Sequence, residues 1–352
     1  MIRFFHRNRK RQAMVCIFLH SMVLTLWSDE PGKQSDFDGQ TGAQPASVYQ
    51  LDLNPNSKKI SYLDLLPIIA WFEEEQRINI NPKNFHKIAI YFDTRIAPGL
   101  CISKNILSAV VEFLEIRGFG KDEISLVTYK MEHETLQSLQ KDFPACPIIT
   151  SESEKYFHGN WFHDSPLPPA TGDRADLLIK YPKEASTRKI MERKSFLPAC
   201  LFLRNTWVIN LAKAKDDYHL GIDGMIANIS LNASSNTLRF RDDATMGPAT
   251  ATEILAIPEF WEKQLFSLMD LSTMQIAGGP GFDAEFIRKE PYLLLSKNPV
   301  FVDYQAIKII DKKRIAAGLK PKNTNHYKLF KFAKQLGLGD PLESKVVKLK
   351  AP

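Results

Sequence analysis

The segment Lys87–Tyr129, KIAIYFDTRIAPGLCISKNILSAVVEFLEIRGFGKDEISLVTY, decides the fold class. It opens with the short apolar run Lys87–Asp93, which is typical of a buried strand. Residues 103–120 have the apolar spacing of an amphipathic helix, with Ser103 as a candidate N-cap. A second apolar run, Ile124–Tyr129, follows and predicts another strand. A strand, a helix and a strand in this order indicate a parallel sheet covered by helices.

The chain downstream continues this pattern of short apolar runs and helical segments. Thr206–Lys213 and the run at 267–273 (SLMDLST) are predicted strands, and a long helix is predicted from about Val300 to Ala317. The run ADLLIKYP, residues 175–182, also has the appearance of a strand. We therefore predict a single α/β domain over residues 61–336, with three layers, a mostly parallel sheet and helices on both faces.

The N-terminus is typical of an export signal. Five basic residues precede the first acid, Asp29, and the apolar run Met14–Trp27 follows those basic residues. This run has about 14 residues, fewer than the roughly 20 that a membrane span needs. We expect residues 1–28 to direct the protein to the periplasm or the cell exterior, and to make its only membrane contact. The alternatives are an uncleaved anchor and a disordered start with a chance apolar patch.

Composition changes at both ends of the predicted domain. Residues 29–60 are rich in Gly, Pro, Ser, Asp and Asn, which predicts a flexible tether, and a helix interrupted at Pro67 is expected to follow from near Tyr62. Residues 337–352 are predicted to form a basic tail. The chain from Asp311 onward carries a net charge of +8, whereas residues 29–310 carry about −7. A basic end can contact phosphates, but we expect no nucleic-acid binding because aromatic residues are not interleaved on a basic face.

The cysteines exclude several classes of metal site. Cys101, Cys146 and Cys200 lie far apart in the body of the chain and form no C-x-x-C motif. We therefore expect no iron–sulfur cluster and no cysteine-ligated metal, and interpret all three as small buried residues. The sequence also contains no Gly-x-Ser-x-Gly and no His-Glu-x-x-His motif, which argues against the common serine and zinc hydrolases.

Polar residues gather directly after the strand at 206–212, in the stretch INLAKAKDDYHLGIDGMIANISLN (209–232). Ligands of open α/β sheets tend to lie beyond the carboxyl ends of the strands. Lysines there can hold an anion, carboxylates can bind a hard metal ion or move a proton, and histidine can do either. The alternative is a solvated loop whose charges pair with each other. The candidate catalytic residues are Lys215, Asp217, His219 and Asp223, and the candidate metal ligands are Asp217, Asp223 and Asp270.

A second candidate is the glycine-rich segment MQIAGGPGFD, residues 274–283, which follows the strand at 267–273. Its glycines allow backbone N–H groups to approach an anion, although a structural tight turn fits the same residues. Asp303 is expected in the first turn of the helix near 300–317, either as a capping or anchoring residue or as part of a site. The candidate binding residues are Lys213, Asn228, Asp270, Gly278, Gly279 and Asp303.

Two blocks, residues 195–230 and 257–319, resemble the domain of unknown function family 362, a bacterial and archaeal family. The resemblance covers about Lys87–Leu319. The second block is similar to the family's strand ending in Asp, its Gly-Pro turn and its helix that opens with Ser-x-Asp-Pro-Val-x-x-Asp. The positions that match the family are Lys215, Gly221, Asn228, Asp270, Gly279, Pro280, Ser296, Pro299 and Asp303.

The chain departs from the family pattern at four positions. The family usually shows His, Thr, Lys and Asp where this sequence has, in order, Asp217 or an offset His219, then Asp223, Ala227 and Asn298. The loss of an imidazole and an ammonium group would change proton transfer and anion binding. The resemblance implies an α/β protein, often exported, with no settled reaction; some relatives carry iron–sulfur segments, whose cysteines this chain lacks.

These observations lead to one expectation and one alternative about function. We expect an exported protein with a cleft for a small anionic ligand or a divalent metal, formed by the loops after the strands at 206–212 and 267–273. Such a cleft could be enzymatic, but the sequence names neither a substrate nor a reaction. The alternative is a non-catalytic binding or scaffold protein that keeps the fold and has lost the side chains of the family's site.

Overall fold

The computed structural model describes most of the chain beyond residue 45. The export segment predicted at residues 1–28, and much of the tether predicted at 29–60, lie outside the described residues. The described ranges are 46–53, 60–94, 99–241, 243–322 and 327–350.

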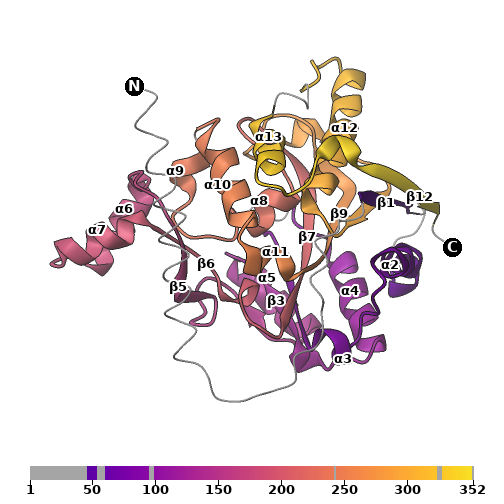
Figure 1. The fold of residues 1–352 in the computed structure, drawn as a ribbon, viewed down its shortest axis with the longest axis horizontal. Coiled ribbons are helices and arrows are strands. Elements are labelled where there is room, and N and C mark those ends of the chain that lie inside the picture. Colours follow the sequence, from indigo (N-terminus) through magenta and orange to yellow (C-terminus); the bar gives the residue numbers. More distant parts are fainter. Residues whose placement is uncertain (1–45, 54–59, 95–98, 242, 323–326, 351–352) are drawn as a thin grey trace. The chain divides into compact units, whose positions relative to one another are not determined.

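A mixed sheet of ten strands lies at the centre of the described residues (Figure 1). Its order is β12 (Lys345–Lys350), β1 (Ser47–Asp52), β11 (Tyr292–Ser296), β9 (Gln264–Gln275), β7 (Thr206–Asp217), β2 (Lys87–Phe92), β3 (Ile124–Val127) and β4 (Ile148–Ile149). Short strands β8 (Gly221–Asp223) and β10 (Ile287–Arg288) pair with β7 and β9. All pairs from β9 to β4 are parallel, whereas β11 is antiparallel to both of its neighbours.

Helices cover both faces of this sheet, and the predicted three-layer α/β fold is confirmed. Alternate residues of β7 enter two separate cores, because Ile209 and Leu211 face one and Val208 and Ala212 face the other. The first core includes residues of α2 (Tyr62–Gln76), α3 (Pro82–Phe85), α4 (Lys104–Ile116) and α5 (His133–Asp142). The second includes residues of α8 (Met225–Ile229), α9 (Leu238–Arg241), α10 (Met246–Leu255), α11 (Pro258–Glu262), α12 (Pro299–Ala316) and α13 (Lys328–Gln335).

The segment 87–129 forms the strand, helix and strand that its sequence predicts. Strands β2 and β3 are parallel neighbours, and α4 connects them across one face of the sheet. The hydroxyl of Ser103 accepts a hydrogen bond from the backbone N–H of Ile106, which confirms Ser103 as the N-cap. Strand β7 pairs with the other side of β2, so the polar residues that follow β2 and β7 reach the same edge of the sheet.

Both ends of the domain extend beyond the predicted bounds. Strand β1 lies inside the segment expected to be a tether, and β12 lies inside the expected tail. The two strands are parallel neighbours, and β1 also pairs with β11. Helix α2 continues through Pro67, where an interruption is expected from the sequence. The described part of the domain therefore extends from β1 to β12, beyond the predicted bounds 61–336.

Residues 157–198 form an excursion from the sheet that we call the arm. It consists of β5 (Phe157–Asp164), α6 (Thr171–Lys180), α7 (Ala185–Arg193) and β6 (Lys194–Pro198), and β5 and β6 pair antiparallel in a small sheet of their own. Most of the run 175–182 lies in α6, so the predicted strand there is wrong. No helix within the described ranges is long and apolar enough to cross a membrane.

Candidate functional site

Charged residues meet at the carboxyl ends of β2, β7 and β9. Asp93 directly follows β2. Lys213 and Lys215 lie within the last five residues of β7, and Asp270 lies in β9. All four side chains are buried. Burying a charge is costly unless another charge or several hydrogen bonds compensate for it, so the partners of these residues decide what they do.

Lys213 and Asp270, two of the expected binding residues, form an internal ion pair. The Lys213 Nζ donates to Asp270 Oδ2 at 2.7 Å, and the two side chains are 4% and 0% exposed. The same ammonium donates to the hydroxyls of Thr273 at 2.5 Å and Ser272 at 3.3 Å. All three N–H groups of the ammonium are thus used within the chain, and the pair ties β7 to β9.

Lys215 and Asp223 belong to a second buried network. The Lys215 Nζ lies 2.9 Å from Asp93 Oδ2 and 3.7 Å from Asp223 Oδ2. The side-chain amide of Asn232 donates to the other oxygen of Asp223 at 2.6 Å. Asp93 and Asn232 are not among the residues expected from the sequence, because their link to Lys215 arises only when β2, β7 and α8 come together.

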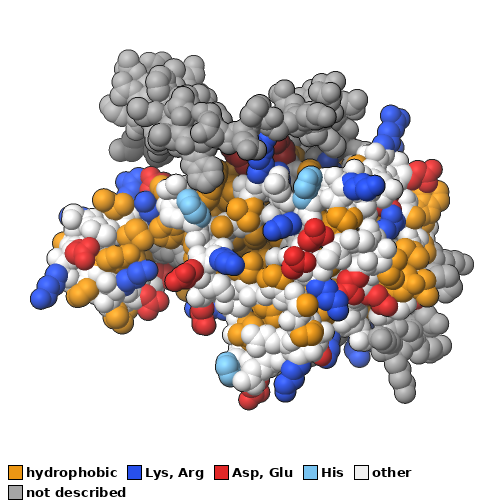
Figure 2. Space-filling model, turned by 90° about the horizontal axis from the view of Figure 1, so that it is seen from below, with side chains coloured by type: hydrophobic (Ala, Val, Ile, Leu, Met, Phe, Trp, Pro, Cys, Tyr) orange, Lys and Arg blue, Asp and Glu red, His pale blue; other side chains and the backbone are white. Residues whose placement is uncertain are grey.

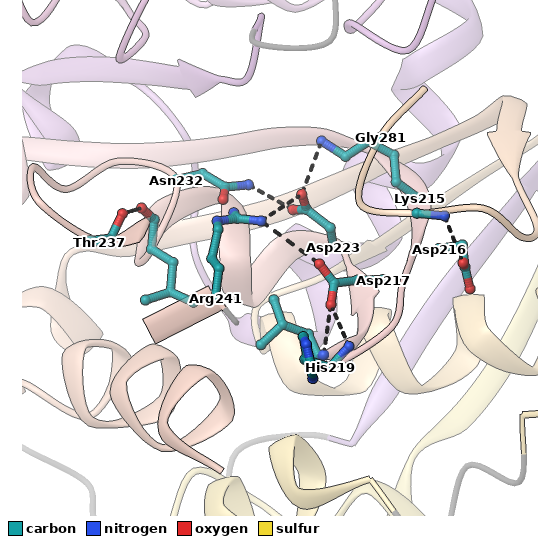
Figure 3. A network of polar contacts seen from close by, with 12 residues as sticks. Lys215, Asp216, Asp217, His219, Asp223, Asn232, Thr237, Arg241 and Gly281 are labelled. Atoms are coloured by element: carbon teal, nitrogen blue, oxygen red, sulfur yellow. Dashed lines mark hydrogen bonds and ion pairs between the residues drawn. The ribbon is translucent and has the colours of Figure 1, made fainter. Parts of the chain in front are cut away.

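Arg241 completes this network next to Asp217 (Figure 3). Its Nη1 lies 3.7 Å from Asp223 Oδ2 and 3.8 Å from Asp217 Oδ2. Asp217 also accepts hydrogen bonds from the backbone N–H groups of His219 and Leu220, at 2.9 and 2.8 Å, and so fixes the turn after β7. Burial, followed by the nearby charge of Asp223, raises the pKa of Asp217.

The three carboxylates expected as metal ligands do not form one site. Asp270 pairs with Lys213, whereas Asp217 and Asp223 lie beside Arg241. Among the residues that the structure describes, no group of three or more His, Cys, Asp or Glu side chains is arranged to hold a metal ion. The geometry therefore does not support Asp217, Asp223 and Asp270 as a metal centre.

Asp303 and Asn228 anchor helix α8 instead of facing a cleft. Asp303 accepts hydrogen bonds from the backbone N–H groups of Met225 and Ile226, at 2.6 and 2.9 Å. Helix α12 begins at Pro299, so Asp303 lies in its second turn, not in the first as expected. The amide of Asn228 donates to Asn210 Oδ1 at 2.7 Å and to the carbonyl of Leu211 at 3.0 Å, both in β7.

The glycine-rich turn after β9 contacts the end of β7, as the sequence predicts. The backbone N–H of Gly279 donates to Asp216 Oδ2 at 2.9 Å. A Cβ on Gly279 would lie only 1.7 Å from the backbone oxygen of Asp216, so this approach requires glycine. The side chain of Gln275 closes the turn, because it donates to the carbonyl of Gly281 and accepts from the N–H of Asp283.

A pocket of about 430 Å³ lies where these two segments meet. Arg314 and Lys322, two cations from the end of α12 and the loop after it, face the carboxylate of Asp216 there. The residues that line the pocket are Asp216, Tyr218, Ala277, Gly278, Gly279, Arg314, Lys322 and Tyr327. The two glycines are the only expected site residues among them.

The cations of this pocket are held in different ways. Lys322 is nearly buried; it pairs with Asp216 and donates to the carbonyls of Asp217 at 2.9 Å and Gly221 at 2.7 Å. Burial lowers the pKa of Lys322, and the charge of Asp216 opposes this shift. Arg314 donates from Nη1 to the carbonyl of Ile276 at 2.6 Å, and that same atom lies 3.8 Å from Asp216 Oδ1.

Comparisons with known proteins add little to this geometry. No family model matches the chain, and no curated protein matches it. A Thermotoga maritima protein with a crystal structure from the Northeast Structural Genomics Consortium is similar at a TM-score of 0.40 and 13% identity over 73% of this chain. The match spans 58% of that protein's length. The resemblance to the domain of unknown function family 362 stays a prediction.

Proposed function

We propose that this protein binds a small anionic ligand in the pocket between the end of β7 and the glycine-rich turn after β9. The observation that supports the proposal is the presence of two cations, Arg314 and Lys322, against the single carboxylate of Asp216 in that pocket. The lining itself thus has a net charge of +1, which favours an anion.

Arg314 is the residue that we assign to ligand contact. The ammonium of Lys322 already has three acceptors in Asp216, Asp217 and Gly221, so it contributes charge and not a free donor. A guanidinium carries five N–H donors in a planar fork that matches a carboxylate or a phosphate. Arg314 uses Nε on the carbonyl of Lys320 and Nη1 on the carbonyl of Ile276, so we assign ligand contact to its Nη2. The rings of Tyr218 and Tyr327 border the pocket and offer apolar surface to the rest of such a ligand.

A binding role agrees better with the geometry than a catalytic role. Lys215, Asp217 and Asp223, three of the expected catalytic residues, are buried and in ionic contact with Asp93, Arg241 and each other. A general acid or base must come within hydrogen-bond reach of its substrate, and these groups are not exposed in the pocket. We therefore prefer the non-catalytic alternative; export of the protein remains a separate proposal based on residues 1–28.

Calorimetric titration of the full chain tests this proposal, with inorganic phosphate and citrate as probes at low ionic strength. We expect saturable binding of at least one probe at one site. Arg314→Met should weaken that binding about tenfold or more, which corresponds to roughly 1.4 kcal/mol. Arg204→Met, which removes an exposed arginine outside the pocket, should leave it unchanged. The absence of saturable binding for both probes, or an equal loss in the two variants, would contradict the proposal.

A further inference from the structure

Helices α6 and α7 of the arm contain no buried residue. Instead they present large apolar side chains to solvent, with Ile179 79% exposed, Ile190 56% and Leu178 46%. Isolated helices of nine or ten residues are marginally stable in water, and helices in proteins usually gain stability by burying an apolar face. The described part of the chain supplies no such cover for this pair of helices.

The base of the arm, in contrast, is held firmly. The guanidinium of Arg239 donates to the carbonyls of Leu167 and Glu192, each at 2.7 Å, and to the carbonyl of Arg193 at 3.0 Å. Arg193 in turn forms a two-bond ion pair with Asp164, at 2.9 and 2.7 Å, across the β5–β6 pair. These contacts fix the direction in which α6 and α7 leave the sheet (Figure 1).

The end of the arm farthest from this base combines apolar and basic residues. Residues 178–183, LIKYPK, include two lysines and no acid, and the ammonium of Lys180 lies 5.6 Å from the ring centre of Tyr181. Lys189 is exposed nearby in α7. The left end of the view in Figure 2, where α6 and α7 lie, shows hydrophobic side chains beside both basic and acidic side chains. We call residues 178–183 the tip.

We propose that the tip docks on a membrane surface that contains anionic phospholipid. Leu178 and Ile179 would enter the boundary between headgroups and acyl chains, and Lys180 and Lys183 would contact the lipid phosphates. The argument is one of charge: residues 171–193, which span α6 and α7, carry six basic and four acidic residues, a net charge of +2, whereas the rest of residues 29–310 carries about −9. Docking through the tip therefore brings the positive charge of the arm to the lipid phosphates.

A second copy of the chain fits this surface less well. In a symmetric dimer the same patch contacts itself, so the net positive charge of residues 171–193 on one copy would face the same charge on the other. Like charges that approach each other in this way oppose association. The proposal is independent of the anion pocket, because no residue of the arm lines that pocket.

Hydrogen exchange measured by mass spectrometry on the full chain tests the proposal locally. We expect vesicles of phosphatidylcholine with phosphatidylglycerol to slow exchange in residues 171–193, and vesicles of phosphatidylcholine alone to have little effect. The double variant Leu178→Glu and Ile179→Glu should lose this protection. Leu342→Glu, which changes a leucine that is 68% exposed outside the arm, should retain it. Because these side chains are exposed, the variants are expected to fold.

Three outcomes would overturn the proposal. If neither kind of vesicle changes hydrogen exchange in residues 171–193, membrane docking by the arm is excluded. Equal protection by neutral and anionic vesicles would remove the role assigned to Lys180 and Lys183. Self-association in analytical ultracentrifugation that disappears in the double variant would instead assign the tip to an interface between two copies of the chain.

Discussion

At the scale of single residues, Lys213 shows how a site prediction can name the right residues and the wrong role. The sequence places Lys213 at the end of one predicted strand and Asp270 within another, and in the structure both lie inside the longer strands β7 and β9. It cannot show that they pair, because they are 57 residues apart and become neighbours only through the parallel register of β7 and β9. A register irregularity between Lys213 and Lys215 further changes which side chains meet.

The Lys213–Asp270 pair should be essential for stability. Lys213→Met leaves the carboxylate of Asp270 buried and without its cation, which should lower the free energy of unfolding by about 3–5 kcal/mol. Lys334→Met is the matched control, because it removes the same group from the exposed pair with Asp340 and should change stability far less. Urea denaturation of both variants measures the difference. Equal losses would show that burial does not decide the strength of these pairs.

Asp303 should make stability depend on pH. Burial raises its pKa from the usual 3.8 to about 7, although two backbone N–H groups favour the charged form. Between these values the folded protein holds a proton that the unfolded chain has lost, so the free energy of unfolding falls as pH rises through this window. Three pKa units correspond to at most roughly 4 kcal/mol.

Asp303→Asn removes this titration and tests the prediction. Relative to the unsubstituted protein, the variant should gain stability as the pH rises from about 4 to 7, and the difference should be constant above that range. Urea denaturation of both proteins at a series of pH values measures it. Parallel pH profiles for the two proteins would show that Asp303 does not titrate in this range.

At the scale of elements, the sequence predicts a helix or strand best where the pattern of neighbouring residues determines it. It predicts least well where contacts with a distant segment determine the structure. Residues 87–129 contain a periodic helix and its cap, and they form as predicted. The run 175–182 has no periodicity to separate a short buried strand from a helix, and it lies in and just after α6. The meeting of the β7 loop with the glycine-rich turn agrees with the expectation that both segments follow strands of one sheet. Arg314 and Lys322 are missed, although the basic composition after Asp311 gives a signal for them.

The glycine-rich turn should tolerate a methyl group at one glycine and not at another. Gly279→Ala places a Cβ 1.7 Å from the Asp216 backbone oxygen and must push the turn away from β7. We expect a loss of roughly 3 kcal/mol in stability, together with weaker phosphate or citrate binding. Gly281→Ala is the control, because a Cβ there meets nothing within 4 Å. Similar effects of the two changes on thermal unfolding would mean that the close approach to Asp216 is not needed.

At the scale of the whole molecule, the first and last strands of the described chain, β1 and β12, form one edge of the sheet. The composition of residues 29–60 and 337–352 predicts a tether and a tail, and this is wrong for β1 and β12. Strand β12 pairs with β1 in parallel, although almost the whole domain separates them in sequence. Val347 and Leu349 of β12 pack against the core shared with α2 and α4. Only two or three apolar residues in each strand carry this contact, and composition averaged over a long polar segment does not reveal them.

Removal of β12 should therefore affect β1, which is distant in sequence but adjacent in the sheet. A chain that ends at Ser344 keeps the hydrogen bonds between Gln305 and Ser344 but leaves β1 as the edge strand, paired only with β11. We expect Tm to fall by roughly 5–10 °C and hydrogen exchange in Ser47–Asp52 to become faster. A chain that ends at Lys350 keeps β12 and is the control. Pairing with β12 protects backbone N–H groups of β1 that a free edge would expose. Unchanged exchange in β1 of the chain that ends at Ser344 would therefore show that β12 does not pair with β1 in solution.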